Sequence, residues 1–162
     1  MEESLMETDR EKAVESDGQN AAGEDLAGQI DLLLGLPEKD WSQYSPLTLA
    51  WIGDTVYDLI VRTALVKRAN MQADKLHRKA AKIVCAPGQA ELIAGIRDRL
   101  TPEEESVYRR GRNSSPRHTA KNSERQVYLE ATGFETLIGY LYLKRRYRRI
   151  LELVCAGTEG AL

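Results

Sequence analysis

The sequence has only two cysteines, no long apolar run and almost no strand signal. Cys85 and Cys155 lie in apolar, helix-like segments, and neither has a second cysteine or a histidine at metal-ligand spacing. This argues against a zinc site or a disulfide framework, so we expect two reduced, buried thiols. No stretch approaches the ~18 apolar residues of a membrane span, and the acidic N-terminus does not resemble a signal peptide. We therefore expect a soluble cytoplasmic protein without membrane contact.

The lack of strand signals leaves helices as the main secondary structure. There is no sustained alternation of apolar and polar residues and no Asn-Gly hairpin, whereas apolar residues recur at helical spacing over long stretches. At 162 residues the chain is long enough for one domain with a core. We predict an all-α domain of about six helices, with two carboxylate-bearing helices at its centre.

Charge divides the chain into an acidic beginning and a basic body. Residues 1–25 contain nine acids and two bases, a net charge of −7, and the remainder contains 16 acids and 21 bases, a net charge of +5. The acidic part has no aromatic residue and too little apolar surface to fold, so we predict disorder there. The leucine-rich stretch 31–36 predicts a turn of helix or a contact surface. We assign 1–40 to an acidic extension and 41–162 to a folded domain whose basic charge suits a polyanionic partner.

Start and stop signals mark the ends of the predicted helices. Ser45 followed by Pro46 is a strong start, because serine accepts from free N–H groups and proline needs no partner at the first position. Thr101 and Pro102 form a second such start, followed by acids in the first turn. The predicted helices span 46–68, 73–85, 87–100, 102–111, 123–145 and a last segment around 150–154. In the first of them, the residues expected to face the core are Leu49, Ile52, Val56, Leu59, Ile60 and Thr63.

The first long helix carries an acid where an apolar residue is expected. Asp54 lies between Ile52 and Val56, and a carboxylate buried there needs a cation, a metal ion or several hydrogen-bond donors. Gly53 beside it costs a helix about 1 kcal/mol relative to alanine, which the close approach of another group would explain. Asp58 follows one turn later on nearly the same face. The alternative is that both acids are ordinary surface carboxylates of an amphipathic helix.

The second long helix repeats this pattern around Glu135. This acid stands among large apolar residues, and Gly133 and Gly139 lie nearby. Two apolar helices with glycines beside their acids can pack closely and present Asp54 and Glu135 to one divalent ion. Oxygen ligands of this kind favour magnesium or manganese over zinc.

Basic residues concentrate in a polar segment and on one predicted helix. Residues 109–122 contain five bases but no apolar side chain larger than alanine, so they cannot be core. Such a segment suits a phosphate backbone, and the alternative is a plain solvated loop. The bases of the 73–85 helix likewise form either a solvated face or a phosphate-contacting surface, and His77 is more simply a polar helix residue. The candidate nucleic-acid-contacting residues are Lys75, Arg78, Lys79, Arg110, Arg112, Asn113, Arg117, Lys121 and Asn122.

Five ordered blocks of residues carry a resemblance to a known family. The blocks are Leu49–Asp58 (LAWIGDTVYD), Leu76–Ala80 (LHRKA), Arg110–Asn113 (RGRN), Lys121–Asn122 (KN) and Ala131–Leu143 (ATGFETLIGYLYL). They resemble the motifs of the Mini-III ribonucleases, compact members of the ribonuclease III class that lack the double-stranded-RNA-binding domain. The resemblance covers about residues 45–155 and leaves the first 40 or so residues outside it.

The resemblance implies an all-α ribonuclease III fold, a homodimer and divalent-metal-dependent cleavage of double-stranded RNA. Asp54 and Glu135 match the family's catalytic residues, which hold Mg²⁺, with Mn²⁺ as a substitute, at the scissile phosphate. The family's usual task is maturation of large-subunit (23S) ribosomal RNA precursors. A large-subunit ribosomal protein is a further expected partner.

The chain departs from the larger ribonuclease III enzymes at two positions. Ala50 and Thr132 stand where those enzymes carry acids, in agreement with Mini-III, so half of the usual acidic quartet is missing. We expect Asp58 to help bind the metal through water. The reduced quartet leaves a catalytically silent RNA-binding or ribosome-assembly protein as an alternative, and a helical interaction module with structural carboxylates is another. Retention of Asp54 and Glu135 argues against the silent protein, and the arginine-rich segment argues against the interaction module.

Overall fold

The computed structural model describes residues 25–114, 122–158 and 162 of the chain. By its backbone contacts the chain divides into two units, residues 1–38 and residues 39–162. The disorder predicted at the N-terminus concerns residues that fall almost entirely outside the described part.

In the first unit, the described residues form one helix, α2 (Leu26–Leu34). The Asp25 carboxylate caps its start by accepting a hydrogen bond from the N–H of Gly28 at 2.6 Å. Gly35 ends the helix in the left-handed conformation, with φ of 61°. The turn of helix expected over 31–36 is therefore part of a longer helix.

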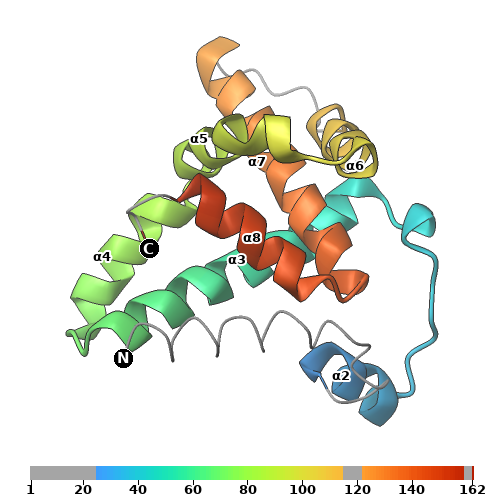
Figure 1. The fold of residues 1–162 in the computed structure, drawn as a ribbon, viewed down its shortest axis with the longest axis horizontal. Coiled ribbons are helices and arrows are strands. Elements are labelled where there is room, and N and C mark those ends of the chain that lie inside the picture. Colours follow the sequence, from blue (N-terminus) through green and yellow to red (C-terminus); the bar gives the residue numbers. More distant parts are fainter. Residues whose placement is uncertain (1–24, 115–121, 159–161) are drawn as a thin grey trace, which may run out of the picture. The chain divides into compact units, whose positions relative to one another are not determined.

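The described part of the second unit contains six α-helices and no strand, which confirms the all-α prediction. In Figure 1, α3 and α7 cross near the centre of this unit and α8 packs beside them. Across the described residues, no helix is long and apolar enough to cross a lipid bilayer. The helices are α3 (Pro46–Arg68), α4 (Ala73–Val84), α5 (Ala86–Ile96), α6 (Pro102–Arg112), α7 (Asn122–Leu143) and α8 (Tyr147–Gly157), with two short 3₁₀ helices at Trp41–Gln43 and Arg97–Arg99.

Both predicted helix starts are capped as their sequences indicate. The Ser45 hydroxyl accepts from the N–H of Thr48 at 3.1 Å at the start of α3. At the start of α6, the Thr101 hydroxyl accepts from the N–H of Glu104, whose carboxylate accepts in return from the N–H of Thr101. This reciprocal capping box satisfies two backbone donors that would otherwise lack partners, so the residue types alone fix where these helices begin.

A close crossing of α3 and α7 forms the centre of the core. A Cβ atom placed on Gly53 would lie 1.8 Å from the backbone oxygen of Glu135, and one on Gly139 would lie 2.0 Å from a backbone oxygen of α3. Only glycine permits two backbones to approach this closely. Tyr57 and Phe134 pack edge to face between the same two helices, with ring centroids 5.0 Å apart. The predicted close packing of the two carboxylate-bearing helices is confirmed.

The buried face of α3 differs from the predicted face. The apolar spacing places Leu59 and Thr63 inside, whereas both are exposed. The close approach at Gly53 decides which side of α3 meets α7, and it turns part of the apolar stripe outward. Because α3 has apolar residues on most of its sides, spacing alone did not identify its inner face. The buried residues are Leu49, Ala50, Gly53, Tyr57, Val61 and Leu65, while Ile52, Val56 and Ile60 are half-buried.

Both cysteines are exposed, so the prediction of buried thiols is wrong. Cys85 lies in the turn between α4 and α5, where its thiol donates to the carbonyl of Lys82 at 3.2 Å. Cys155 lies on the outer side of α8, next to Leu153 and Val154, which face the core. The apolar residues that suggested burial face the core, whereas Cys85 lies in the turn after α4 and Cys155 on the outer side of α8.

Candidate active site

Asp54 and Glu135 come together because they flank the crossing of α3 and α7. Gly53 meets the backbone of Glu135, and Asp54 is the next residue along α3. The two carboxylates are close enough for the negative charge of Asp54 to raise the pKa of Glu135. The structure thus brings together the two acids that the sequence pairs, and it does so through the glycines beside them.

The two carboxylates differ in their exposure to solvent. Asp54 is exposed, whereas Glu135 is half-buried. The expectation of a buried Asp54 is therefore wrong. The side chain of Asp54 points about 100° around the helix from Gly53, which faces α7, so Asp54 stands at the edge of the crossing and not inside it. The pair consequently has one acid open to solvent and one acid partly within the protein.

A third polar side chain, Gln89 of α5, reaches the same pair. It is only 1% exposed, and its amide nitrogen Nε2 lies 3.4 Å from Asp54 Oδ1 and 3.1 Å from the carbonyl oxygen of Val84. It also lies close enough to the carboxyl group of Glu135 to lower the pKa of that acid. Gln89 was not among the residues predicted from the sequence. A signal was present, because Gln89 shares the spacing i, i+3, i+4, i+7 with the buried residues of α5 and is the polar member of that stripe.

The environment of Glu135 favours its protonated form. Burial, and secondly the charge of Asp54, raise the pKa of Glu135 to about 7, while the hydrogen bond from Gln89 opposes this rise. One of these two adjacent carboxylates resists ionisation. A cation bound between them would stabilise their ionised forms. The donors are all oxygens, as Mg²⁺ and Mn²⁺ prefer, so the residues fit the expected ion. Among the described residues no three acids, histidines or cysteines form a metal-holding group, so the remaining ligands would be water or substrate oxygens.

Asp58 has a different partner. Its Oδ2 accepts from Arg62 Nε at 2.6 Å, one turn further along α3. Its other oxygen, Oδ1, is buried and has no hydrogen-bond partner in the structure. The structure does not bring Asp58 into a three-carboxylate cluster with Asp54 and Glu135. A role for Asp58 through an intervening water stays a prediction.

The basic candidates fall into three groups. Lys75, Arg78 and Lys79 are exposed along the outer side of α4. At the end of α6, Arg110 lies over the ring of Trp41 with 5.4 Å between guanidinium carbon and ring centroid, and Asn113 is the exposed C-cap residue. Arg112 Nε donates to Glu130 Oε1 at 2.8 Å, so an acid of α7 already balances its charge. Arg117 and Lys121 lie outside the described residues, as does the side chain of Asn122, the first residue of α7.

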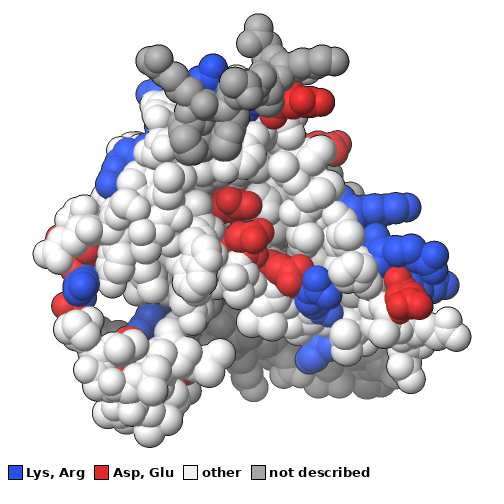
Figure 2. Space-filling model, turned by 180° about the vertical axis from the view of Figure 1, so that it is seen from behind, with Lys and Arg blue, Asp and Glu red and all other residues white. Residues whose placement is uncertain are grey.

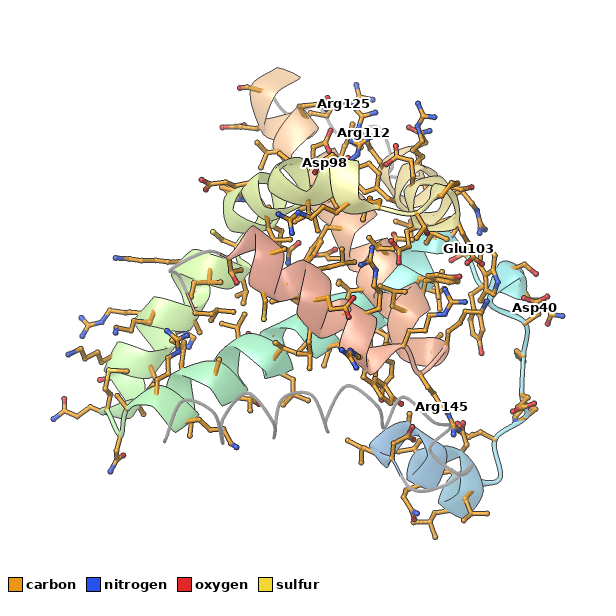
Figure 3. The ribbon with its side chains drawn as sticks, viewed as in Figure 1. Asp40, Asp98, Glu103, Arg112, Arg125 and Arg145 are labelled. Atoms are coloured by element: carbon orange, nitrogen blue, oxygen red, sulfur yellow. The ribbon has the colours of Figure 1, made fainter. Side chains whose placement is uncertain are left out.

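An open groove lies beside the end of α6. It has a volume of about 530 Å³, and its lining includes Pro46, Arg109, Arg110 and Asn113. Arg109 is exposed and was not singled out from the sequence, although it opens the basic segment. Figure 3 shows Arg112 and Arg125 near the start of α7, and Arg125 is exposed there. Seen from behind the view of Figure 1, acidic side chains form a short row in a largely uncharged surface (Figure 2).

Replacing Glu135 tests whether its ionised carboxylate destabilises the fold in the absence of metal. Its pKa rises from 4.5 when unfolded to about 7 when folded, so folding favours the protonated acid. The stability from this group is present below pH 4.5 and is lost as the pH rises through 7. Glu135→Gln, which mimics the protonated acid, should match the parent at pH 4 and exceed its free energy of unfolding by about 1–2 kcal/mol at pH 8. Urea unfolding in chelator across this range measures the difference, and a difference that does not change with pH would contradict it.

Comparison with known proteins gives a class to this fold and site. The chain matches the ribonuclease III domain over residues 47–146. A Mini-ribonuclease 3 from Thermoanaerobacter sp. (strain X514) is 46% identical over 110 residues, which cover 68% of this chain and 78% of the relative. The Mini-ribonuclease 3 of Enterococcus faecalis is 40% identical over 118 residues, covering 72% of this chain and 89% of the relative. The X-ray crystal structure of a Fusobacterium nucleatum protein matches with a TM-score of 0.67 and 25% identity, covering 77% of this chain and 100% of that one.

The all-α fold, the acid pair at its central crossing and the domain match define a ribonuclease III catalytic domain. The chain belongs to the Mini-ribonuclease 3 family within that class. It is accordingly an endoribonuclease, and the resemblance expected from the five sequence blocks is confirmed.

Proposed function

We propose that this endoribonuclease cleaves double-stranded RNA in a reaction that depends on a divalent metal ion. Its proposed substrate is the precursor of large-subunit (23S) ribosomal RNA, and its proposed location is the cytoplasm. The observation that carries the proposal is the pair of Asp54 and Glu135 at the crossing of α3 and α7. Such a pair has no evident structural use, because the charge of Asp54 disfavours the ionised form of Glu135.

Each acid has a distinct part in the proposed mechanism. When bound, the divalent ion supplies activation of a water for in-line attack on phosphorus and stabilisation of the leaving 3′-oxygen. Glu135 offers its carboxylate from α7 and must first release the proton that its surroundings favour. Asp54 offers a second carboxylate from α3, and its exposure leaves it accessible to a phosphate group.

An exposed apolar stripe on α3 supports the proposed homodimer. Trp51, Leu59 and Val66 are 77%, 58% and 60% exposed, and helical geometry places them on one side of α3. A group of large apolar side chains on one exposed face commonly marks an interface. Pairing two chains there about a two-fold axis would set two acid pairs against the two strands of a duplex. Sedimentation at micromolar concentrations tests this, and a monomer would count against the duplex arrangement.

A cleavage assay tests the function directly. The purified protein is incubated with long duplex RNA, with single-stranded RNA of the same sequence and with precursor large-subunit ribosomal RNA, each in Mg²⁺, in Mn²⁺ and in chelator. We expect cleavage of the duplex and of the paired region of the precursor in either metal and none in chelator. Cleavage of the single strand alone, or cleavage that persists in chelator, would contradict the proposal. No cleavage under any metal and salt condition would favour the catalytically silent RNA-binding alternative.

The exposed bases of α4 are proposed to contact RNA phosphates together with those at the end of α6. The triple substitution of Lys75, Arg78 and Lys79 by alanine should weaken duplex binding and reduce the slope of log affinity against log salt by about 1 for each phosphate that is no longer neutralised. Fluorescence anisotropy in chelator measures this without cleavage. Arg148→Ala on α8, where Arg148 pairs with Glu152, is the matched control. An unchanged salt slope in the triple variant would remove α4 from the RNA-binding surface.

A further inference from the structure

Gln89 is a polar residue in a place that an apolar residue would fill. It is 1% exposed and shares the buried side of α5 with Leu92, Ile93 and Ile96. Burying an amide is unfavourable unless its hydrogen bonds are made inside the protein. Placing Gln89 there is therefore less favourable than placing an apolar residue unless its hydrogen bonds are made. The partners of its amide indicate what the amide does there.

The partners of Gln89 join the acid pair to the turn between α4 and α5. Its Nε2 contacts Asp54 Oδ1 on one side and the carbonyl oxygen of Val84, the last residue of α4, on the other. The same side chain lies near Glu135 and lowers the pKa of its carboxyl group. The backbone contact fixes the orientation of the amide, and the amide in turn donates to Asp54 of α3 and stands near Glu135 of α7.

We propose that Gln89 is a positioning residue that holds the carboxylates of Asp54 and Glu135 in the arrangement that binds the divalent ion. This inference rests on the proposed function of that pair. The donated hydrogen bond restricts the rotation of Asp54, which is exposed and follows a glycine. An amide that is fixed by the backbone, bonded to Asp54 and near Glu135 also keeps the separation of the two acids constant before any ion binds, which is the usual contribution of residues behind metal ligands.

The chemistry of the amide suits this position better than the alternatives. An acid at residue 89 would add a third negative charge, and a lysine would satisfy both carboxylates and compete with the metal ion. A leucine would leave the two acids with no donor between them. Glutamine supplies a hydrogen-bond donor without a net charge. Its carbonyl oxygen Oε1 is buried and has no partner in the structure, so an acceptor remains for a donor that arrives with the ion or the substrate.

The test compares Gln89→Leu with the parent in three measurements. We expect the affinity for Mn²⁺ without RNA, measured by calorimetry, to fall by about 10-fold or more, as for other residues that orient metal ligands. We expect the single-turnover rate constant on duplex RNA to fall by about 10- to 100-fold, with the RNA concentration at half-maximal rate changed less than about twofold. The thermal midpoint should be unchanged or higher, because leucine suits the apolar surroundings. Gln43→Leu, at an exposed glutamine of the first 3₁₀ helix, is the matched control and should leave all three measurements at the parent value.

Two results would overturn the positioning role. If Gln89→Leu binds Mn²⁺ and cleaves RNA like the parent, Gln89 is only a core residue. If weaker Mn²⁺ binding and slower cleavage are accompanied by a fall in thermal midpoint and by weaker RNA binding, the effect is structural. A failure of the proposed function looks different, because the parent and Asp54→Asn would then bind Mn²⁺ equally well, whatever Gln89→Leu does.

Discussion

Asp54→Asn and Glu135→Gln are each expected to reduce the rate of RNA cleavage in Mg²⁺ by about 1,000-fold or more. Each substitution removes one of the two carboxylates proposed to hold the ion, and stabilisation of transition-state charge by a metal is worth several kcal/mol. The proteins should remain folded, because Asp54 is exposed and the amide of the Glu135 variant resembles the protonated acid that the site already favours. Single-turnover cleavage of labelled duplex RNA measures the effect.

Two further aspartates provide controls for this prediction. Asp98→Asn, in the second 3₁₀ helix, should cleave at the parent rate because the residue lies outside the acid pair. Asp58→Asn tests the water-mediated role and should lower the rate less than either main variant, since Asp58 is held by Arg62. Undiminished cleavage by Asp54→Asn or by Glu135→Gln would remove that residue from the active site.

Gly139→Ala and Gly53→Ala are expected to destabilise the fold by about 3 kcal/mol or more, within the range of overpacking and backbone displacement in a core. The added Cβ atoms would lie 2.0 Å and 1.8 Å from backbone oxygens of the opposite helix, and a backbone cannot move aside as a flexible side chain can. Relief requires α3 and α7 to separate. The acids of the pair would then separate as well, so cleavage should fall together with stability in both variants. Thermal and urea unfolding measure the first effect, and the duplex assay measures the second.

Gly95→Ala is the matched control for this pair of variants. Gly95 lies within α5, and a Cβ atom there meets no atom within 4 Å. Alanine is the better helix former by about 1 kcal/mol, so this variant should be unchanged or slightly more stable. If Gly139→Ala behaved like Gly95→Ala, the two helices would not depend on this close approach, and the explanation of how Asp54 meets Glu135 would be wrong.

Local chemistry in the sequence was sufficient for several features of this protein. Ser45 and Thr101 mark helix starts because capping involves residues at most three positions apart, and the structure contains both caps. Gly53 and Gly139 indicated a close helix approach because a glycine inside a helix has a known energetic cost. Asp54 and Glu135 were paired because each acid interrupts an apolar stripe. The absence of strand patterns was sufficient for the all-α class.

Only the tertiary structure decided which side of each helix faces which neighbour. Because α3 meets α7 at Gly53, Leu59 faces outward and Asp54 lies at the solvent-exposed edge of the crossing. Contacts between residues far apart in the sequence, such as Gln89 with Asp54, arise from this packing and from no local pattern. The sequence alone thus determined the helices and the two acids. The burial, charge state and third polar partner of those acids depend on how three helices meet, because burial and electrostatic interaction are properties of the space between them.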